Sequence, residues 1–361
     1  MGRVAVDAMG SDGAPASELA GAVAALRYGP AELSVILVGD EPSLRARLVG
    51  MAGAPTARLS IRHAAKVLAP DESPARAARS GGDTSLGVAF ELVARGEADA
   101  VVSAGNSGAL LALGSLRLGR LPGVLRAAIA AVVPTPRGQT VLCDAGATVE
   151  PRPEALAQFA LLGALLAREL FARATPRVGL LANGREAHKG TPLVRAAHQL
   201  LVRLAPDAGL DYRGLVEGHD LFGGALDVMA TDGFTGNALL KGAEGAIAAS
   251  AALLDEELAA SSPARLGKWL ARGALARART RASWVEAGGA LLVGVAGTVV
   301  VCHGRSGARA MTGALLAADR AATAGVHHKI AVALARHREV WVGATSEPTS
   351  EPTSEPESET P

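Results

Sequence analysis

The sequence predicts an α/β protein: a three-layer α/β/α sandwich with a mostly parallel sheet, plus a protruding helical arm. Short apolar strands alternate with longer helical segments along the chain. This alternation is typical of a parallel sheet with helices on both faces. Glycine, hydroxyl and aspartate residues directly follow several strands. Ligands bind outside the carboxyl ends of such strands, so we expect the functional site there.

Length and composition bound the protein class. The chain has 361 residues, of which 49% are hydrophobic and 20% charged, enough for a large core in one domain or two. We expect a single domain over residues 1–342 with the arm at about 238–286. The Thr-Ser-Glu-Pro repeats of 343–361 carry no apolar residue beyond proline, which predicts a disordered tail. A net charge of +1 argues against a nucleic-acid partner.

Cysteine usage and the N-terminus favour a cytoplasmic protein. Cys143 and Cys302 are the only cysteines, and both end apolar strands, which favours a reduced, buried state. No Cys/His cluster has zinc-ligand spacing. The chain begins with a strand rather than a signal-peptide pattern. No apolar run reaches the ~18 residues needed to span a bilayer, although residues 155–167 come closest.

The elements follow in order. Turn residues before Pro15 lead into the first helix, and the Pro134–Gly138 link makes the fifth and sixth strands hairpin-like. The expected strands cover 4–6, 33–38, 59–62, 100–102, 127–133, 139–143, 177–181 and 215–217, with a strand pair in 288–302. The expected helices cover 16–26, 43–49, 86–95, 154–171, 192–204, 238–258 and 308–340, the last broken near Gly325.

The stretch from Ala98 to Leu111 reads as a buried strand, a tight turn and a helix start. Gly105 and Gly108 permit positive φ and close backbone approach. Ser103, Asn106 and Ser107 are residues that cap helices. Such a turn directs N–H donors and the positive end of a helix dipole at one point, which suits an anion.

The same pattern recurs downstream. Residues 227–236 align with residues 99–108: aspartate, hydroxyl, glycine, hydroxyl and glycine share one spacing. The second copy contributes Asp232, Gly233, Thr235 and Gly236 as candidate binding residues, and Asp144 begins a shorter relative after the strand at 140–143. Either these corners converge on one anionic ligand, or they are ordinary strand-to-helix joints.

Other polar residues at strand ends leave two interpretations open. Asp7 and Asp12 follow the first strand and could ligate a cation, orient a ligand or form turn hydrogen bonds. Lys189 precedes a helix and could meet a phosphate, or be a solvated lysine. His303 ends a strand before a glycine and is either an acid/base candidate or a structural histidine.

A basic segment follows the long Ala/Leu helix. Arg265, Lys268, Arg272 and Arg279 fall on one helical face, with Trp269 among the interleaved apolar residues. Such a helix can lie on an anionic bilayer, each cation contributing about 1 kcal/mol. A dimer-packing arm with a solvated basic face explains the pattern equally well.

Together these motifs resemble the bacterial phosphate acyltransferase family PlsX over roughly residues 3–335. The matching stretches are Ala5–Asp12, Ser103–Gly108, Asp144–Gly146, Lys189–Gly190, Asp232–Asn237 with Lys241, Gly294–Gly304, and Ala308–Ala310. Departures from the family pattern are Gly81, Thr148, Ala296 and Arg305. The resemblance implies transfer of a long-chain acyl group from acyl carrier protein to inorganic phosphate, for phospholipid synthesis. It also implies a homodimer whose arm touches the membrane, with no metal and no organic cofactor.

The chemistry this implies needs little proton transfer, because phosphate is largely anionic near pH 7 and a thiolate is a tolerable leaving group. The turns at 103–108 and 232–237 could cup the phosphate, and Lys189 would neutralise its charge. Asn237 or His303 could donate to the oxyanion or protonate the sulfur. Rival interpretations are a short-chain phosphotransacylase using coenzyme A and a non-catalytic membrane-bound anion-binding scaffold. No Gly-x-Gly-x-x-Gly follows a strand, which argues against a dehydrogenase.

Overall fold

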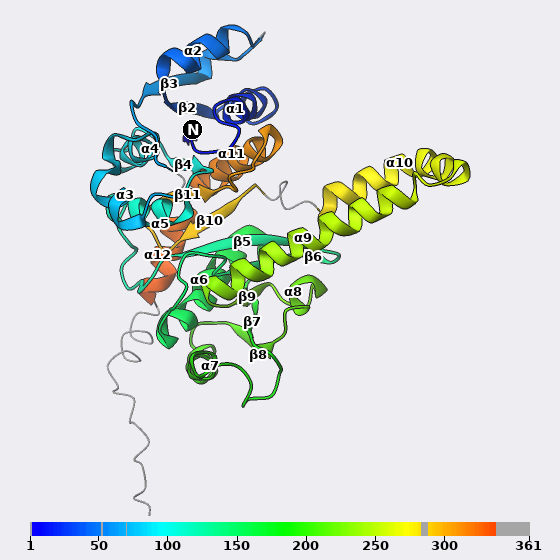
Figure 1. Ribbon diagram of the computed structural model, residues 1–361. Helices are drawn as coiled ribbons and strands as arrows, with labels where there is room; N and C mark the ends of the chain where they lie inside the picture. Colours follow the sequence, from blue (N-terminus) through cyan, green and yellow to red (C-terminus); the bar gives the residue numbers. More distant parts are fainter. Residues whose placement is uncertain (1, 52, 70, 283–287, 337–361) are drawn as a thin grey trace, which may run out of the picture.

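The computed structural model describes residues 2–51, 53–69, 71–282 and 288–336, and shows one sheet between two helical layers (Figure 1). Within these residues the sheet has 11 strands in the order β3-β2-β1-β4-β11-β10-β5-β6-β9-β7-β8. The predicted α/β class is confirmed. The tail at 343–361 and the end of the last predicted helix lie outside the described residues, so the predicted domain boundary stays a prediction.

The strands are short, as the alternation predicts. They are β1 Arg3–Asp7, β2 Ser34–Gly39, β3 Leu59–His63, β4 Ala100–Ser103, β5 Ala128–Thr135, β6 Gly138–Cys143, β7 Arg177–Leu181, β8 Asp211–Val216, β9 Val228–Ala230, β10 Ala290–Val293 and β11 Thr298–Val301. The β5–β6 hairpin and the β10–β11 pair are confirmed as antiparallel. The strand predicted at 215–217 instead runs from Asp211 to Val216.

The helices include two short ones that the sequence pattern did not reveal, α3 and α8. The helices are α1 Ala16–Tyr28, α2 Glu41–Val49, α3 Pro74–Ser80, α4 Ser85–Ala94, α5 Ser107–Arg117, α6 Pro153–Phe171, α7 Pro192–Leu204, α8 Asp220–Gly223, α9 Gly233–Glu257, α10 Ser262–Ala282, α11 Ala308–Thr323 and α12 Val326–Arg336. The predicted break near Gly325 is present, where that glycine has a φ of 63° between α11 and α12.

The sheet reverses direction at its centre, which the sequence pattern did not predict. Strands β3, β2, β1, β4 and β11 are mutually parallel, and so are β6, β9, β7 and β8. Three antiparallel pairings, β11–β10, β10–β5 and β5–β6, lie between them. An odd number of reversals makes the two sets run in opposite directions. We call them the first half-sheet (β3 to β11) and the second half-sheet (β6 to β8).

The strand register nevertheless brings the carboxyl ends of both half-sheets to one level. Ser103, the last residue of β4, pairs with Val301, which pairs with Ala290. Ala290 pairs with Ala131 of β5, and Ala131 with Leu142, the second-last residue of β6. The corners after β4 and after β6 therefore face each other across β11, β10 and β5.

Two apolar layers flank the sheet. Alternate strand residues such as Val4 and Val6 pack with α1 and α11, and the same face continues under α6, α7 and α12. Strand residues of the opposite parity, such as Ala5, pack under α4 and α5. Successive strand residues point to opposite faces of the sheet, and both faces are covered by helices. Consecutive residues are therefore all buried, which explains why the strands read as continuous apolar runs.

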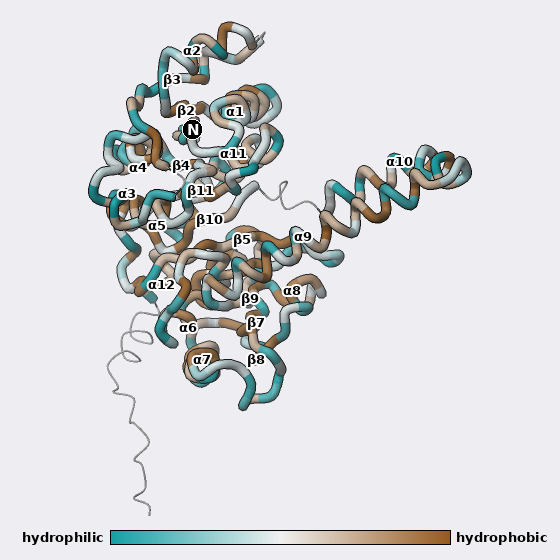
Figure 2. The backbone as a smooth tube through the Cα atoms, viewed as in Figure 1, coloured by the Kyte–Doolittle hydropathy of each residue, from teal (hydrophilic) through white to brown (hydrophobic). Residues whose placement is uncertain are grey.

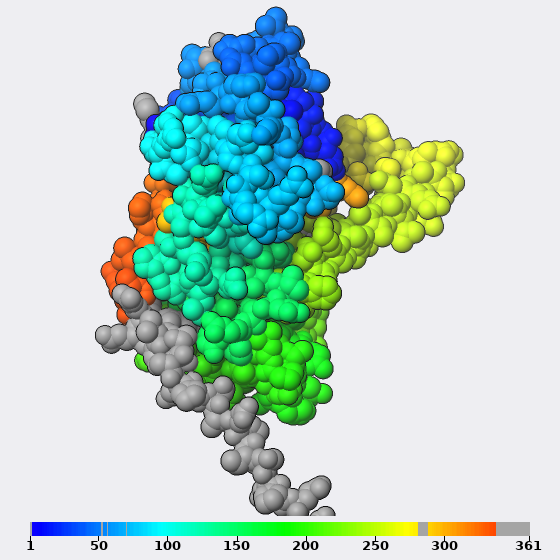
Figure 3. Space-filling view, turned by 60° about the vertical axis from the view of Figure 1, so that its left-hand side comes forward, coloured from blue at the N-terminus to red at the C-terminus, as the bar shows by residue number. Residues whose placement is uncertain are grey.

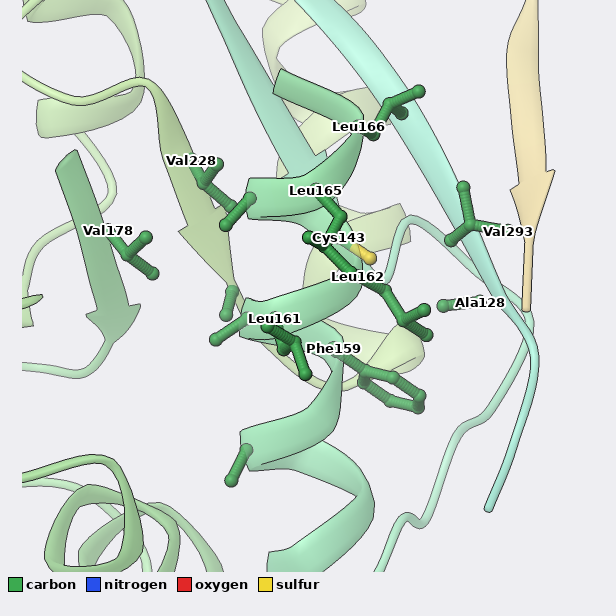
Figure 4. Close-up of a cluster of buried hydrophobic side chains, with 14 of the residues drawn as sticks. Ala128, Cys143, Phe159, Leu161, Leu162, Leu165, Leu166, Val178, Val228 and Val293 are labelled. Carbon is green, nitrogen blue, oxygen red and sulfur yellow. The ribbon is translucent and has the colours of Figure 1, made fainter. Parts of the chain in front are cut away.

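Helix α6 is the most buried helix of the second half-sheet. Every residue from Ala155 to Ala167 is buried, because α6 packs between the sheet and helices α7 and α12. Figure 4 shows its leucines between Val178 and Val228 on one side and Ala128 and Val293 on the other. The longest apolar run of the sequence is thus a core helix. In the described residues, no helix combines the length and apolar character that crossing a bilayer requires.

Helices α9 and α10 form the arm, which projects away from the sheet (Figures 1 and 3). Helix α9 begins at Gly233, five residues before the predicted start at 238. The reason is a cap: the Asp232 carboxylate accepts a hydrogen bond from the Thr235 backbone N–H at 2.8 Å. The first turn of the arm is therefore built from the second glycine-rich corner.

Candidate active site

A cavity of about 380 Å³ lies where the carboxyl ends of the two half-sheets meet. Its walls come from the corners after β4, β6 and β11, the middle of β5, and the first turns of α9. The described lining residues are Gly105, Ser107, Ile129, Ala131, Val132, Ala145, Gly146, Asn237, Leu240, Lys241, Glu244, Gly289, Ala290, Val301, Cys302, His303, Gly304, Ser306 and Ala310. The lining combines polar residues with apolar strand residues.

A larger cavity of about 510 Å³ lies at the β7–β8 edge, but its cations are already paired. Arg177 bonds Asp227 at 2.9 Å, Arg185 bonds Asp220 at 2.8 Å, and Arg213 bonds Asp211 at 2.6 Å. Because a carboxylate already neutralises each of these guanidinium groups, we take the central cavity as the candidate active site.

The corner after β4 brings Gly105 and Ser107 into the cavity. Ser103 is fully buried, and its hydroxyl donates to Asp7 at 2.7 Å and accepts from the Gly105 N–H at 3.0 Å. Asn106 caps α5, with its side-chain oxygen accepting from the Ala109 N–H at 3.0 Å. Gly108 lies against Pro74 rather than in the lining. Ser103 and Asn106 thus shape the corner, while Gly105 and Ser107 face the cavity.

The loop after β1 supports this corner from behind. Asp7 is 2% exposed; burial raises the pKa of its carboxyl, while hydrogen bonds from Ser85, Ser103 and the Met9 backbone oppose that rise. Gly10 packs directly on Gly105, because a Cβ there would lie 2.9 Å from the Gly105 nitrogen. The Asp12 N–H donates to the Gly304 carbonyl at 2.8 Å. Neither aspartate is among the lining residues: Asp7 contacts the β4 corner, and the Asp12 backbone contacts the β11 corner.

The corner after β6 is organised by the fully buried Asp144. Its two carboxylate oxygens accept from the backbone N–H groups of Ile129, Gly146, Ala147 and Thr148 at 2.6–3.0 Å. Burial raises the pKa of this carboxyl, and those four donors oppose the rise. With its acceptors occupied, Asp144 fixes the turn that presents Gly146 to the cavity.

The corner after β9 packs tightly against the corner after β6. A Cβ on Gly236 would lie 1.9 Å from the Asp144 carbonyl oxygen, and one on Gly233 2.8 Å from the Thr148 carbonyl oxygen. The Gly233 N–H also donates to that Thr148 carbonyl at 2.8 Å. These glycines let α9 press against the β6 corner, and neither they nor Asp232 and Thr235 line the cavity. The predicted phosphate cup at 232–237 reaches the cavity only through Asn237.

Three polar side chains of the lining come from α9 and from the end of β11. Asn237 stands beside Gly146, where a Cβ added to the glycine would lie 3.5 Å from the Asn237 Cβ. One turn along α9, Lys241 Nζ lies 3.2 Å from His303 Nε2. The other ring nitrogen of His303, Nδ1, accepts from the Arg305 backbone N–H at 3.2 Å. The contact between Lys241 and His303 joins α9 to the end of β11 across the cavity.

Lys189 lies elsewhere along the same edge. It follows β7 in the loop before α7, where its side chain packs on Gly184 beside Glu186. It is not among the lining residues. Lys241, by contrast, is a lining lysine to which the sequence pattern gave no role. Its position four residues after Asn237, on the same face of a helix, was the available signal.

The two cysteines are poor nucleophiles. Cys143 is fully buried, which raises the pKa of its thiol well above the ordinary value. Cys302 contributes to the cavity wall, but burial, with the nearby Glu18 charge, raises the pKa of its thiol to about 12. A thiol in this state holds almost no thiolate at neutral pH.

In fold, the chain is of the class that contains phosphotransacetylases. It is similar to the EutD phosphotransacetylase of Staphylococcus aureus, with a TM-score of 0.56 at 14% identity over 89% of this chain and 94% of that one. It is also similar to a phosphotransacetylase of Streptococcus pyogenes, with a TM-score of 0.56 at 17% identity over 90% and 94%.

Sequence relatives specify the family. A family model described as "Fatty acid synthesis protein" matches residues 2–329. The phosphate acyltransferase of Myxococcus xanthus is 45% identical over 92% of this chain and 94% of its own length. That of Syntrophotalea carbinolica is 44% identical over 86% and 88%. The chain belongs to the bacterial phosphate acyltransferase family PlsX, as the motifs predicted.

Proposed function

We propose that this protein transfers a long-chain acyl group from acyl carrier protein to inorganic phosphate, forming acyl phosphate for phospholipid synthesis. The observation that carries the proposal is one cavity whose lining combines cationic and hydrogen-bonding side chains with apolar strand residues. Lys241, His303 and Asn237 are among the first, and Ile129 and Val132 among the second. An anion and an acyl chain are the two kinds of group that such a cavity can hold together.

The reaction requires alignment more than proton transfer. A phosphate oxygen attacks the thioester carbon, the C–O bond forms, and the C–S bond breaks as the thiolate leaves. Phosphate at neutral pH already carries the charge needed for attack. Holding both reactants in one cavity supplies proximity, and Asn237 or His303 donates to the developing oxyanion or to the departing sulfur. Lys189 remains a predicted phosphate ligand whose loop follows the neighbouring strand β7.

The test combines purified protein, long-chain acyl-acyl carrier protein and phosphate, with hydroxylamine to trap acyl phosphate as the hydroxamate. The proposal expects hydroxamate that depends on phosphate and exceeds that formed from short-chain acyl-coenzyme A. A preference for short acyl-coenzyme A would favour the phosphotransacylase interpretation. Phosphate binding without hydroxamate would favour an anion-binding scaffold.

We further propose that the arm places the protein, as a homodimer, on an anionic membrane surface. Trp269 and Leu270 of α10 are 58% and 70% exposed, and Leu253 of α9 is 64% exposed. Figure 2 shows hydrophobic and hydrophilic positions alternating along both helices of the arm. The Arg272 guanidinium lies 4.9 Å from the Trp269 ring centroid, so cation and aromatic share one surface.

Vesicle sedimentation tests whether the arm binds an anionic membrane. Trp269→Ser with Leu270→Ser should release the protein from anionic vesicles, because removal of apolar surface weakens interfacial binding. Val332→Ser, an exposed apolar residue on α12, is the matched control. Sedimentation equilibrium on the same proteins measures the dimer. Equal vesicle binding by both variants would refute the membrane role.

A further inference from the structure

The imidazole of His303 faces two hydrogen-bond donors at once. The Arg305 backbone N–H donates to Nδ1 at 3.2 Å, and Lys241 Nζ stands 3.2 Å from Nε2. A neutral imidazole has one acceptor nitrogen, and the other carries hydrogen. A peptide N–H can only donate, so Nδ1 is the acceptor and Nε2 carries the hydrogen.

Lys241 therefore meets a donor rather than an acceptor. A lysine ammonium has three N–H donors and no acceptor, so the Nε2–H and the ammonium point at the same space without an acceptor between them. Protonation of His303 would make the conflict worse, because both groups would then be cations. Opposing donors at this distance are stabilised when an oxygen that accepts from both lies beside them.

The protein does not supply that oxygen in the part of the chain described. Lys66, Lys268 and Lys329 each form an ion pair, at 2.7, 3.0 and 2.8 Å from a carboxylate oxygen. Lys241 has no such pair among the described residues, although Glu244 lines the cavity one turn further along α9. The pair is exposed to the cavity, so a small anion can reach it.

Other donors in the cavity lining favour the same occupant. Gly105 and Ser107 lie at the start of α5, a helix of 11 residues whose N-terminal N–H groups favour an anion. The donor pair and this helix start belong to the lining of one cavity. We propose that Lys241 Nζ and the Nε2–H of His303 together hold an oxygen of inorganic phosphate.

This inference rests on the proposed function only for the identity of the anion. Phosphate is favoured over the thioester carbonyl because phosphate is negatively charged before the reaction begins, whereas the carbonyl is neutral. A lysine ammonium binds a charged oxygen more strongly than a neutral one. If the pair instead served only the oxyanion of the transition state, it would affect kcat without affecting phosphate binding.

Titration calorimetry with inorganic phosphate alone, without an acyl donor, tests the proposal. Lys241→Met should weaken phosphate binding by roughly 10- to 100-fold, as expected for a lost hydrogen bond to a charged group. Lys329→Met, which removes an exposed lysine on α12, is the matched control and should bind like the unchanged protein. An unchanged dissociation constant in Lys241→Met would overturn the proposal, whether or not kcat falls.

Two substitutions of His303 test the ring nitrogen. The amide nitrogen of Gln reaches about as far as Nε2, whereas that of Asn reaches only as far as Nδ1. His303→Gln should therefore retain most of the phosphate affinity, and His303→Asn should lose it to about the extent of Lys241→Met. Equal affinities in the two variants would overturn the assignment of Nε2–H as the donor. Because phosphate binding is measured without acyl transfer, a protein that binds phosphate but makes no acyl phosphate would refute only the proposed function.

Discussion

Two stretches of the chain share one sequence pattern, but one lines the cavity and the other packs against the β6 corner. Asp99 to Gly108 and Asp227 to Gly236 share aspartate, hydroxyl and glycine at identical spacing. Each begins with an aspartate that bonds the backbone N–H and side chain of the arginine opening the neighbouring strand, Arg3 for Asp99 and Arg177 for Asp227. The strand beginnings are thus equivalent, whereas the corners that follow them are not.

The difference arises from where the helix cap stands. In the first copy Asn106 caps α5, which leaves Gly105 outside the helix and in the cavity wall. In the second copy Asp232 caps α9, so Gly233, the equivalent of Gly105, becomes the first helical residue. It then packs on the β6 corner instead of facing the cavity. The residue spacing thus predicts a strand-to-helix joint. The position of the capping side chain decides whether the glycine lies in the cavity wall or inside the helix.

The equivalent last glycines should show the largest difference. Gly236→Ala places a Cβ 1.9 Å from the Asp144 carbonyl oxygen, which four backbone donors to the Asp144 side chain hold in place. We expect a loss of about 3 kcal/mol in the free energy of unfolding. Gly108→Ala meets a Pro74 side-chain atom at 2.8 Å, and alanine favours the helix, so its cost should be about 1 kcal/mol or less. Urea unfolding measures both, and equal costs would show that the second corner is not held by packing.

The opening aspartates should differ less. Asp227 is 3% exposed: burial alone would raise its pKa, but the hydrogen bonds and charge of Arg177, with Arg173, lower it below the ordinary value. Asp227→Asn should cost about 2 kcal/mol at neutral pH. Asp99→Asn, whose ion pair with Arg3 is solvent-exposed, should cost less than about 1 kcal/mol.

The lowered pKa of Asp227 also predicts how its contribution to the free energy of unfolding changes with pH. A lowered folded-state pKa contributes stability above the ordinary aspartate range and loses it as the pH falls through the folded value. The difference in unfolding free energy between the unchanged protein and Asp227→Asn should therefore shrink in acid. A constant difference down to pH ~3 would contradict the assigned ion pair.

The smallest effect is expected at the cavity-wall cysteine. Cys302→Ala should keep kcat within a few-fold, because burial raises the pKa of the thiol to about 12 and leaves it protonated. Cys143→Ala, in the core under α6, is the control for loss of a buried sulfur. Complete loss of hydroxamate formation in a folded Cys302→Ala protein, with acyl-enzyme detected in the unchanged one, would establish a covalent intermediate instead.

Sequence reasoning was most reliable where a local signal decides structure. Short apolar runs located most strands, and Pro134 with Gly138 marked the β5–β6 hairpin correctly. The reversal of the sheet was not predicted, because strand direction depends on long-range pairings such as β10 with β5. For the same reason the pattern drew attention to Lys189, whose glycine neighbour is local, and gave no role to Lys241, which meets His303 only in the folded chain.

The reversal of strand direction also bears on how such an enzyme can diversify. A uniformly parallel sheet would assemble its loops along one rim, so a change in one loop would crowd its neighbours. Here the loops of two oppositely directed sets approach a shared space from different sides, with β5 and β10 as a common floor. Because Lys241 belongs to one side and His303 to the other, a substitution on either side would alter the proposed phosphate contact.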